Sequence, residues 1–163
     1  MNTEIVDLEN EEKDVRCVVA MHGLNEHLDI LVHDPAWEVR YEVAKRAYRK
    51  HMDILVHDSH PEVKCIATRY GAREHLDILV KDKDSDVRCA VAENGLLDHL
   101  DILVKDSDSH VRCAVAKYGS KEHLDMLAND DHPDVRNAVE RTLHLQAAQT
   151  KYLGITEIRY VKF

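Results

Sequence analysis

The chain has 163 residues, of which 44% are hydrophobic and 33% are charged, and its formal net charge is −9 with histidine neutral. This acidic balance argues against nucleic-acid binding, because the lysines and arginines are interleaved with aspartate and glutamate rather than gathered on one face. No apolar run approaches the roughly 20 residues that span a bilayer, so we expect no membrane association.

The N-terminal sequence and the cysteine spacing both favour a cytoplasmic protein. The first residues, MNTEIVDLENEEKD, are acidic and polar and lack the basic and apolar regions of a secretory signal. The four cysteines stand at positions 17, 65, 89 and 113. That spacing differs from the disulfide framework of a small secreted domain.

A 24-residue repeat organises the chain. His27, His51, His75, His99 and His123 each open a near-copy of one segment, such as HLDILVKDKDSDVRCAVAENGLLD at 75–98. Repeats with a period in this range form solenoids, in which each repeat buries its apolar face against its neighbours. The repeats cover 3–26 (degenerate), 27–50, 51–74, 75–98, 99–122 and 123–146. We expect one domain over 1–149, ending in a longer helix over 137–149, and a tail or cap over 150–163.

Each repeat contains two apolar stripes at helical spacing. In the repeat 75–98 they are Leu76, Leu79 and Val80, and then Val87, Ala90 and Val91. A polar corner over 81–85 separates the two predicted helices. Glycine follows the second helix at positions 23, 71, 95 and 119, where we expect a left-handed helix end. The fold class predicted is therefore all-α.

The motif L-x-x-L-x-x-D-x-x-x-x-V-R-x-x-V-A resembles the leucine-rich repeat variant family, a relative in style of HEAT repeats. Two of its copies are carried by Leu76, Leu79, Asp82, Val87, Arg88, Val91 and Ala92, and by Leu100, Leu103, Asp106, Val111, Arg112, Val115 and Ala116. The resemblance covers residues 3 to about 145 and implies a right-handed α-solenoid of alternating α-helices and shorter, often 3₁₀, helices. Some family members carry an N-terminal cysteine cluster that holds an iron–sulfur centre. Only Cys17 precedes residue 65 here, so no cofactor is implied.

Charged residues recur in columns along the repeats. An arginine column lies beside an aspartate column in the motif, and it could form an anion-binding strip. We expect instead that each arginine pairs with the aspartate of its own or the adjacent repeat and fixes the corner. This structural ladder comprises Asp34, Asp58, Asp82, Asp106, Asp130, Arg40, Arg88, Arg112 and Arg136.

The histidine column is not expected to bind metal. Adjacent helical layers place equivalent ring nitrogens about 10 Å apart, whereas a zinc ion needs its nitrogens within about 2 Å. We expect these histidines to cap helices or to form hydrogen bonds between repeats. The chain also lacks G-x-S-x-G, a phosphate-binding glycine loop and H-E-x-x-H, so we expect no catalytic residues and no enzyme.

Candidate partner-binding residues are those that depart from the repeat. The second repeat holds the only tryptophan among several aromatic and basic residues, the types enriched at interface hot spots. Trp37 could equally staple the corner that follows Pro35. The candidates are Trp37, Tyr41, Tyr48, Arg49, Tyr70, Tyr152, Tyr160 and Phe163.

The last three of these belong to the non-repeat tail. From Ile155 onward its β-branched and aromatic residues are typical of a strand. The tail could cap the last repeat, lie in an acidic groove or pair with the edge of a partner's sheet, and we expect capping.

Together these patterns predict a non-enzymatic repeat scaffold that binds an unidentified protein or peptide. The alternative is an acidic inhibitor that mimics nucleic acid, because carboxylates recur at regular spacing along the array. A lyase or glycosylase of the kind that HEAT-like folds host is a third, weaker hypothesis.

Overall fold

A computed structural model of the chain describes residue 8 and residues 11–46, 48–71 and 73–153. These residues form eleven α-helices and no strand, which confirms the predicted all-α repeat fold. The odd-numbered helices are α1 (Lys13–His22), α3 (Trp37–Lys45), α5 (Pro61–Tyr70), α7 (Ser85–Glu93), α9 (Ser109–Tyr118) and α11 (Pro133–Leu153). The even-numbered helices are α2 (Asn25–Leu31), α4 (Arg49–Leu55), α6 (Arg73–Leu79), α8 (Leu97–Leu103) and α10 (Lys121–Leu127). The strand predicted from Ile155 lies outside the described residues.

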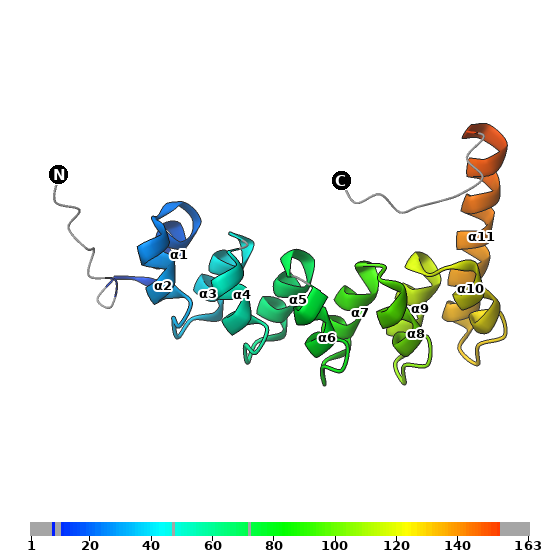
Figure 1. Cartoon of the computed structure of the whole chain (residues 1–163), viewed down its shortest axis with the longest axis horizontal. Helices are drawn as coiled ribbons and strands as arrows, with labels where there is room; N and C mark the ends of the chain where they lie inside the picture. The colour runs from blue at the N-terminus through cyan, green and yellow to red at the C-terminus, as the bar shows by residue number, and fades with distance from the viewer. Residues whose placement is uncertain (1–7, 9–10, 47, 72, 154–163) are drawn as a thin grey trace. The chain divides into compact units, whose positions relative to one another are not determined.

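Long and short helices alternate along the chain, which forms two compact units over 1–75 and 76–163. The short helices have seven residues each and are α-helical. In the first unit the long helices α1, α3 and α5 lie side by side, and in the second α7, α9 and α11 do (Figure 1). The short helices α2, α4, α8 and α10 each contact the long helix before them and the long helix after them. Neighbouring repeats therefore share one continuous core within each unit.

The apolar positions of the motif form this core. In the repeat 99–122, Leu100 and Leu103 of α8 and Val111, Val115 and Ala116 of α9 are at most 1% exposed. Fully burying a side chain of the leucine or valine size stabilises a fold by about 1.5–3 kcal/mol. The hydrophobic spacing read from the sequence thus coincides with the observed core.

The recurring glycines end their helices in two different ways. Gly95 alone among the described glycines has a positive φ, 67°, as expected of a left-handed helix end. Gly23, Gly71 and Gly119 have extended backbones, so the left-handed conformation predicted for them is wrong. Their helices run one residue further than α7, and glycine itself becomes the C-terminal cap. A Cβ added at Gly119 would lie 2.6 Å from the carbonyl oxygen of Val115, so close backbone approach explains the missing side chain.

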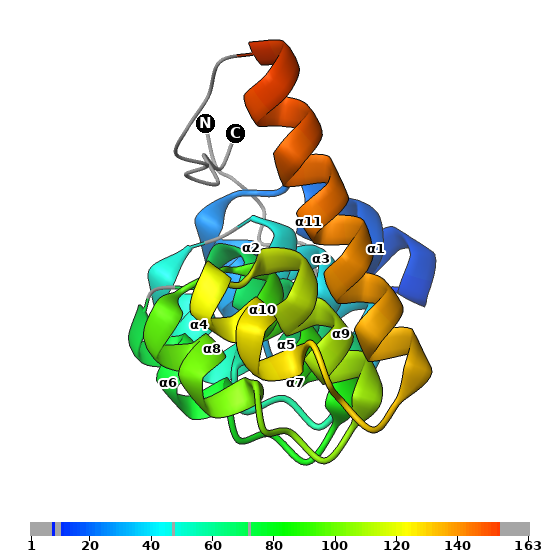
Figure 2. The same cartoon turned by 90° about the vertical axis from the view of Figure 1, so that its right-hand side faces the viewer.

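The last helix is the longest one described. α11 has 21 residues and continues past the expected domain boundary at 149, and Figures 1 and 2 both show it extending beyond α9 and α10. Val135, Val139 and Thr142 are buried, whereas Leu143 and Leu145 are exposed. None of the described helices combines the length and the apolar composition that crossing a membrane requires.

Candidate partner-binding site

The arginine and aspartate columns are joined from one repeat to the next. Arg88 donates through Nε and Nη2 to the two carboxylate oxygens of Asp106, over 2.7 and 2.8 Å. Arg40 donates to the two carboxylate oxygens of Asp58 in the same way, over 2.6 and 2.8 Å. Equivalent paired bonds join Arg16 to Asp34 and Arg112 to Asp130. Each of these arginines therefore reaches the aspartate of the following repeat.

Both members of a pair also bind backbone groups at the corner. Arg88 donates through Nη1 to the carbonyl of Asp82, and Asp106 accepts the backbone N–H of Asp108 over 2.9 Å. Burial of Asp106 opposes ionisation, but the Arg88 guanidinium and this N–H together hold its pKa below the ordinary value. The same two kinds of backbone bond recur at the other ladder corners, including that of Arg136 and Asp130.

The histidine column joins repeats in the opposite direction. The ring Nε2 of His99 lies 2.6 Å from Oδ1 of Asp77 in the preceding repeat. His51 with Asp29, His75 with Asp53 and His123 with Asp101 repeat this bond. At His27 and His123 the ring Nδ1 also accepts the N–H of the residue before the short helix. The column therefore shows both functions expected of it. The bonds between repeats are made by the buried His51, His75, His99 and His123, and the helix caps by His27 and His123.

The charged side chains of these columns bind one another between repeats, so few of them are available to a ligand. The ladder carboxylates of Asp34, Asp58, Asp106 and Asp130 are at most 9% exposed. The described residues contain no group of three or more histidine, cysteine or carboxylate side chains placed to hold a metal ion. Burial raises the pKa of the Cys89 thiol to about 11, so this cysteine is mainly protonated near neutral pH.

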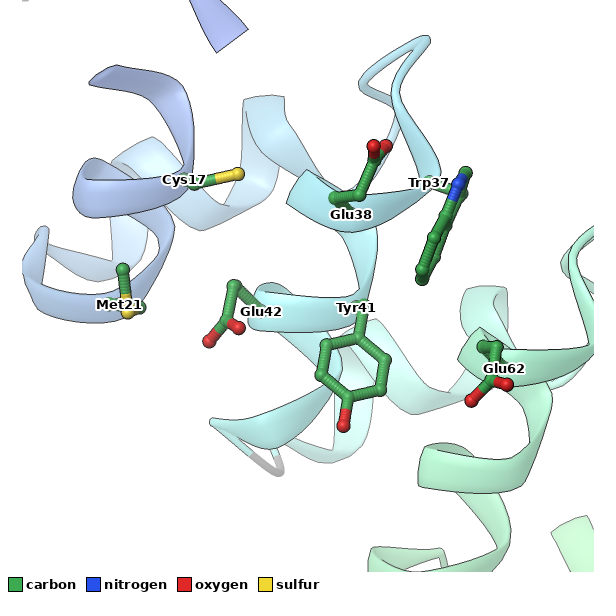
Figure 3. A pocket seen from close by; sticks show the side chains of 7 residues that line it. All are labelled: Cys17, Met21, Trp37, Glu38, Tyr41, Glu42 and Glu62. Carbon is green, nitrogen blue, oxygen red and sulfur yellow. The ribbon is translucent and has the colours of Figure 1, made fainter. Parts of the chain in front are cut away.

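A pocket of about 340 Å³ opens instead where the second repeat departs from the pattern (Figure 3). Its lining combines two aromatic rings and two carboxylates from α3 with apolar and sulfur-containing side chains from α1 and one carboxylate from α5. These residues are Cys17, Met21, Trp37, Glu38, Tyr41, Glu42 and Glu62. The volume lies within the range of small-ligand and side-chain pockets.

The aromatic wall is held in place by ring contacts. Trp37, the first residue of α3, stacks on His60 with centroids 4.0 Å apart and planes inclined by 2°. Tyr41, one turn further along α3, meets Trp37 edge to face at 6.3 Å. Such ring pairs contribute about 0.5–1.5 kcal/mol beyond area burial. Trp37 is half-buried, so part of its ring remains available to a partner.

Two of the three carboxylates at the pocket already have cationic partners. Lys13 of α1 donates to Glu38 over 2.8 Å, and Lys45 of α3 pairs with Glu42 at 3.0 Å. Lys45 also lies 5.6 Å from the centroid of the Tyr41 ring. Within the described part of the chain, Glu62 has no ion-pair partner. The pocket therefore carries more negative than positive charge.

Comparison of the repeats shows which signal marks this pocket. Trp37 stands where the fourth and fifth repeats have Ser85 and Ser109, and Tyr41 stands in the cysteine column. Both of these lining residues are candidates that the sequence had singled out. The three glutamates of the lining, Glu38, Glu42 and Glu62, were not singled out, because acidic residues are common throughout the chain. Met21 was not singled out either. Glu42 could have been found by its column, where later repeats carry Ile66, Ala90, Ala114 and Ala138.

Among the described residues, none of the remaining candidates belongs to the lining of this pocket. Tyr48 lies edge to face with His51 at the start of α4, and Arg49 forms an exposed ion pair with Glu74. Tyr70 is 49% exposed at the end of α5. Tyr152 is 76% exposed on α11, in the other compact unit. Tyr160 and Phe163 lie outside the described residues.

Comparison with solved structures identifies the fold. A structure described as a leucine-rich repeat variant with a novel repetitive protein structural motif superposes on this chain with a TM-score of 0.73 and 28% sequence identity. The match covers 82% of this chain and 57% of that one. The chain has the leucine-rich repeat variant fold. No protein-family model matches it, and no curated protein does either. The chain thus spans little more than half the length of the solved protein that it resembles.

Proposed function

We propose that this protein is a non-enzymatic scaffold that binds a protein or peptide partner at the pocket over α3. One observation carries the proposal. Trp37 and Tyr41, which break the repeat, are brought together on one helix and line a preformed pocket. Aromatic residues in such positions are typical of interface hot spots.

The remaining features are consistent with a scaffold. The recurring charged residues are used for contacts between repeats, so they hold the array together and are not free for acid–base chemistry. None of the four cysteines, all of them in the described part of the chain, is in a disulfide, which fits a reducing compartment, and we place the scaffold in the cytoplasm. Fold alone does not specify a function, so the proposal rests on the pocket.

The test compares capture of partners by the intact chain and by a variant that restores repeat-like residues. Trp37→Ser with Tyr41→Asn introduces the residues found at the equivalent positions 85 and 137, so the fold should be retained. Circular dichroism of the double variant checks that its helical fold is retained. Tyr152→Ser serves as a control on the exposed part of α11, and Tyr160→Ser with Phe163→Ser tests the tail.

We expect a protein captured by the intact chain and by the Tyr152 and tail variants to be lost from the Trp37 and Tyr41 variant. Capture that is unaffected by the Trp37 and Tyr41 changes would refute the assignment of binding to this pocket. Loss on the tail changes alone would move recognition to residues 154–163.

A further inference from the structure

The pocket over α3 has the chemistry of a site for a basic side chain. We infer that it takes an arginine or lysine side chain from the polypeptide partner, an inference that rests on the proposed function. The pocket combines two aromatic side chains, apolar side chains and three carboxylates in a single cavity. A long aliphatic stem that ends in a positive charge requires this combination.

The apolar part of the lining fits the stem of such a side chain. Cys17 and Met21 of α1 line one side of the pocket and Trp37 and Tyr41 line the other, with Glu42 between Met21 and Tyr41 (Figure 3). Lysine and arginine bury their methylene groups against apolar surface while the charged group stays near water. A cation within about 6 Å of an aromatic centroid is also attracted by the ring. The rings and the apolar side chains therefore act on different parts of one ligand.

The three carboxylates of the pocket favour a ligand with a positive charge. Glu38, Glu42 and Glu62 contribute three negative charges, against the two positive charges of Lys13 and Lys45. An anionic segment would meet this excess of negative charge, and a purely apolar one would desolvate the carboxylates without replacing their water. A basic side chain satisfies both requirements.

The chain's own lysines show where a cation is stable. The ammonium group of Lys45 lies both 3.0 Å from Glu42 and 5.6 Å from the Tyr41 centroid. The side chains of Lys13 and Lys45 are 48% and 45% exposed. Exposed pairs of this kind contribute little to stability, so a partner's guanidinium or ammonium can take their place beside the carboxylates at small cost.

The sole tryptophan of the chain provides a direct readout, because its fluorescence reports on this pocket and on no other site. Three probes are titrated into the intact chain at low salt. They are a glycine–serine peptide with one central arginine, the same peptide with citrulline, which is isosteric and uncharged, and spermidine. We expect the arginine peptide to change Trp37 fluorescence with an affinity at least about fivefold higher than that of the citrulline peptide.

Two matched variants separate the pocket from the general acidity of the chain. Glu62→Gln removes the carboxylate that has no ion-pair partner and should weaken arginine-peptide binding about threefold or more. Glu140→Gln makes the same change in net charge at an exposed residue of α11 and should leave arginine-peptide binding unchanged. Equal binding of the arginine and citrulline peptides, or equal effects of the two variants, would overturn the inference. So would spermidine binding more tightly than the arginine peptide, which would assign the pocket to a free polyamine.

These outcomes are distinguishable from failure of the proposed function. If a partner is lost on the Trp37 and Tyr41 changes but the arginine and citrulline peptides bind alike, the scaffold proposal stands and the basic side chain is wrong. If partner capture ignores those changes, the proposed function itself fails.

Discussion

Substitution of Asp106 by alanine tests whether the ladder bonds hold the repeats together. Asp106 accepts two hydrogen bonds from Arg88, over 2.7 and 2.8 Å, and one from the backbone N–H of Asp108 over 2.9 Å. The variant removes all three bonds and leaves the Arg88 side chain, which is 13% exposed, without its carboxylate. Arg88 keeps its bond to the carbonyl of Asp82.

The magnitude lies between two measured limits. Breaking a fully buried ion pair by removing one partner costs about 3–5 kcal/mol, whereas an exposed pair contributes about 0–1 kcal/mol. The side chains of Arg88 and Asp106 are 13% and 9% exposed, so this pair lies between the two limits and nearer the buried one. We therefore expect Asp106→Ala to lower the free energy of unfolding by about 2–3 kcal/mol.

Urea denaturation followed by far-ultraviolet circular dichroism measures this loss. With a urea dependence of about 1–3 kcal/mol per molar, the midpoint should fall by roughly 1 M. Asp125→Ala is the matched control. Its carboxylate is exposed and has no ion-pair partner among the described residues, so its effect should stay within about 0.5 kcal/mol.

The pH dependence gives a second check. The pKa of Asp106 is lowered in the folded state, so its contribution is complete above the ordinary value of 3.8 and is lost as pH falls through the lower folded pKa. The difference between the intact chain and the variant should therefore shrink below pH 3.8. A loss under about 1 kcal/mol at pH 7, or one equal to that of Asp125→Ala, would show that the pair behaves as an exposed one.

Three further predictions concern single residues. Gly119→Asn should destabilise the fold more than Gly95→Asn. Asparagine tolerates the positive φ of residue 95, whereas any Cβ at residue 119 meets the Val115 carbonyl oxygen. Thermal denaturation measures the difference, and equal losses would contradict the close-approach explanation. Asp101→Ala should cost about 1 kcal/mol more than Asp125→Ala, because it removes the acceptor of buried His123, and urea midpoints would show this. Cys89 should be alkylated more slowly at pH 8 than the cysteine of a short peptide, because burial raises the pKa of the Cys89 thiol to about 11. Mass spectrometry measures both rates, and a rate for Cys89 equal to that of the peptide would refute the prediction.

The regular part of the fold follows from the sequence because one spacing repeats. The apolar positions of the motif coincide with the core, and the arginine and aspartate columns lie within bonding distance. The direction of the bonds did not follow, since an arginine could have reached its own repeat or either neighbour. Only the positions of the helices decide that Arg88 meets Asp106.

The glycine prediction was wrong at three positions for a local reason. α5 and α9 each include one residue, Tyr70 or Tyr118, that has no helical counterpart in α7, where the helix ends at Glu93. A one-residue change in helix length turns a left-handed corner into an extended one, and helix ends are the least certain part of any pattern. The sequence singled out the two aromatic residues of the pocket but not its glutamates, because aromatic residues are rare in this chain and glutamates are common.

The two kinds of bond between repeats have a consequence for how such arrays change length. In each described ion pair of the ladder the arginine reaches 18 residues forward, and in each described bond from a column histidine to an aspartate the histidine reaches 22 residues back. Each of these bonds therefore connects a repeat only to its immediate neighbour. Inserting or deleting a whole 24-residue segment would therefore leave each internal charge with the same kind of partner as before. Unequal recombination between near-identical gene segments could lengthen or shorten this protein in a single step, without a buried charge ever losing its counterion.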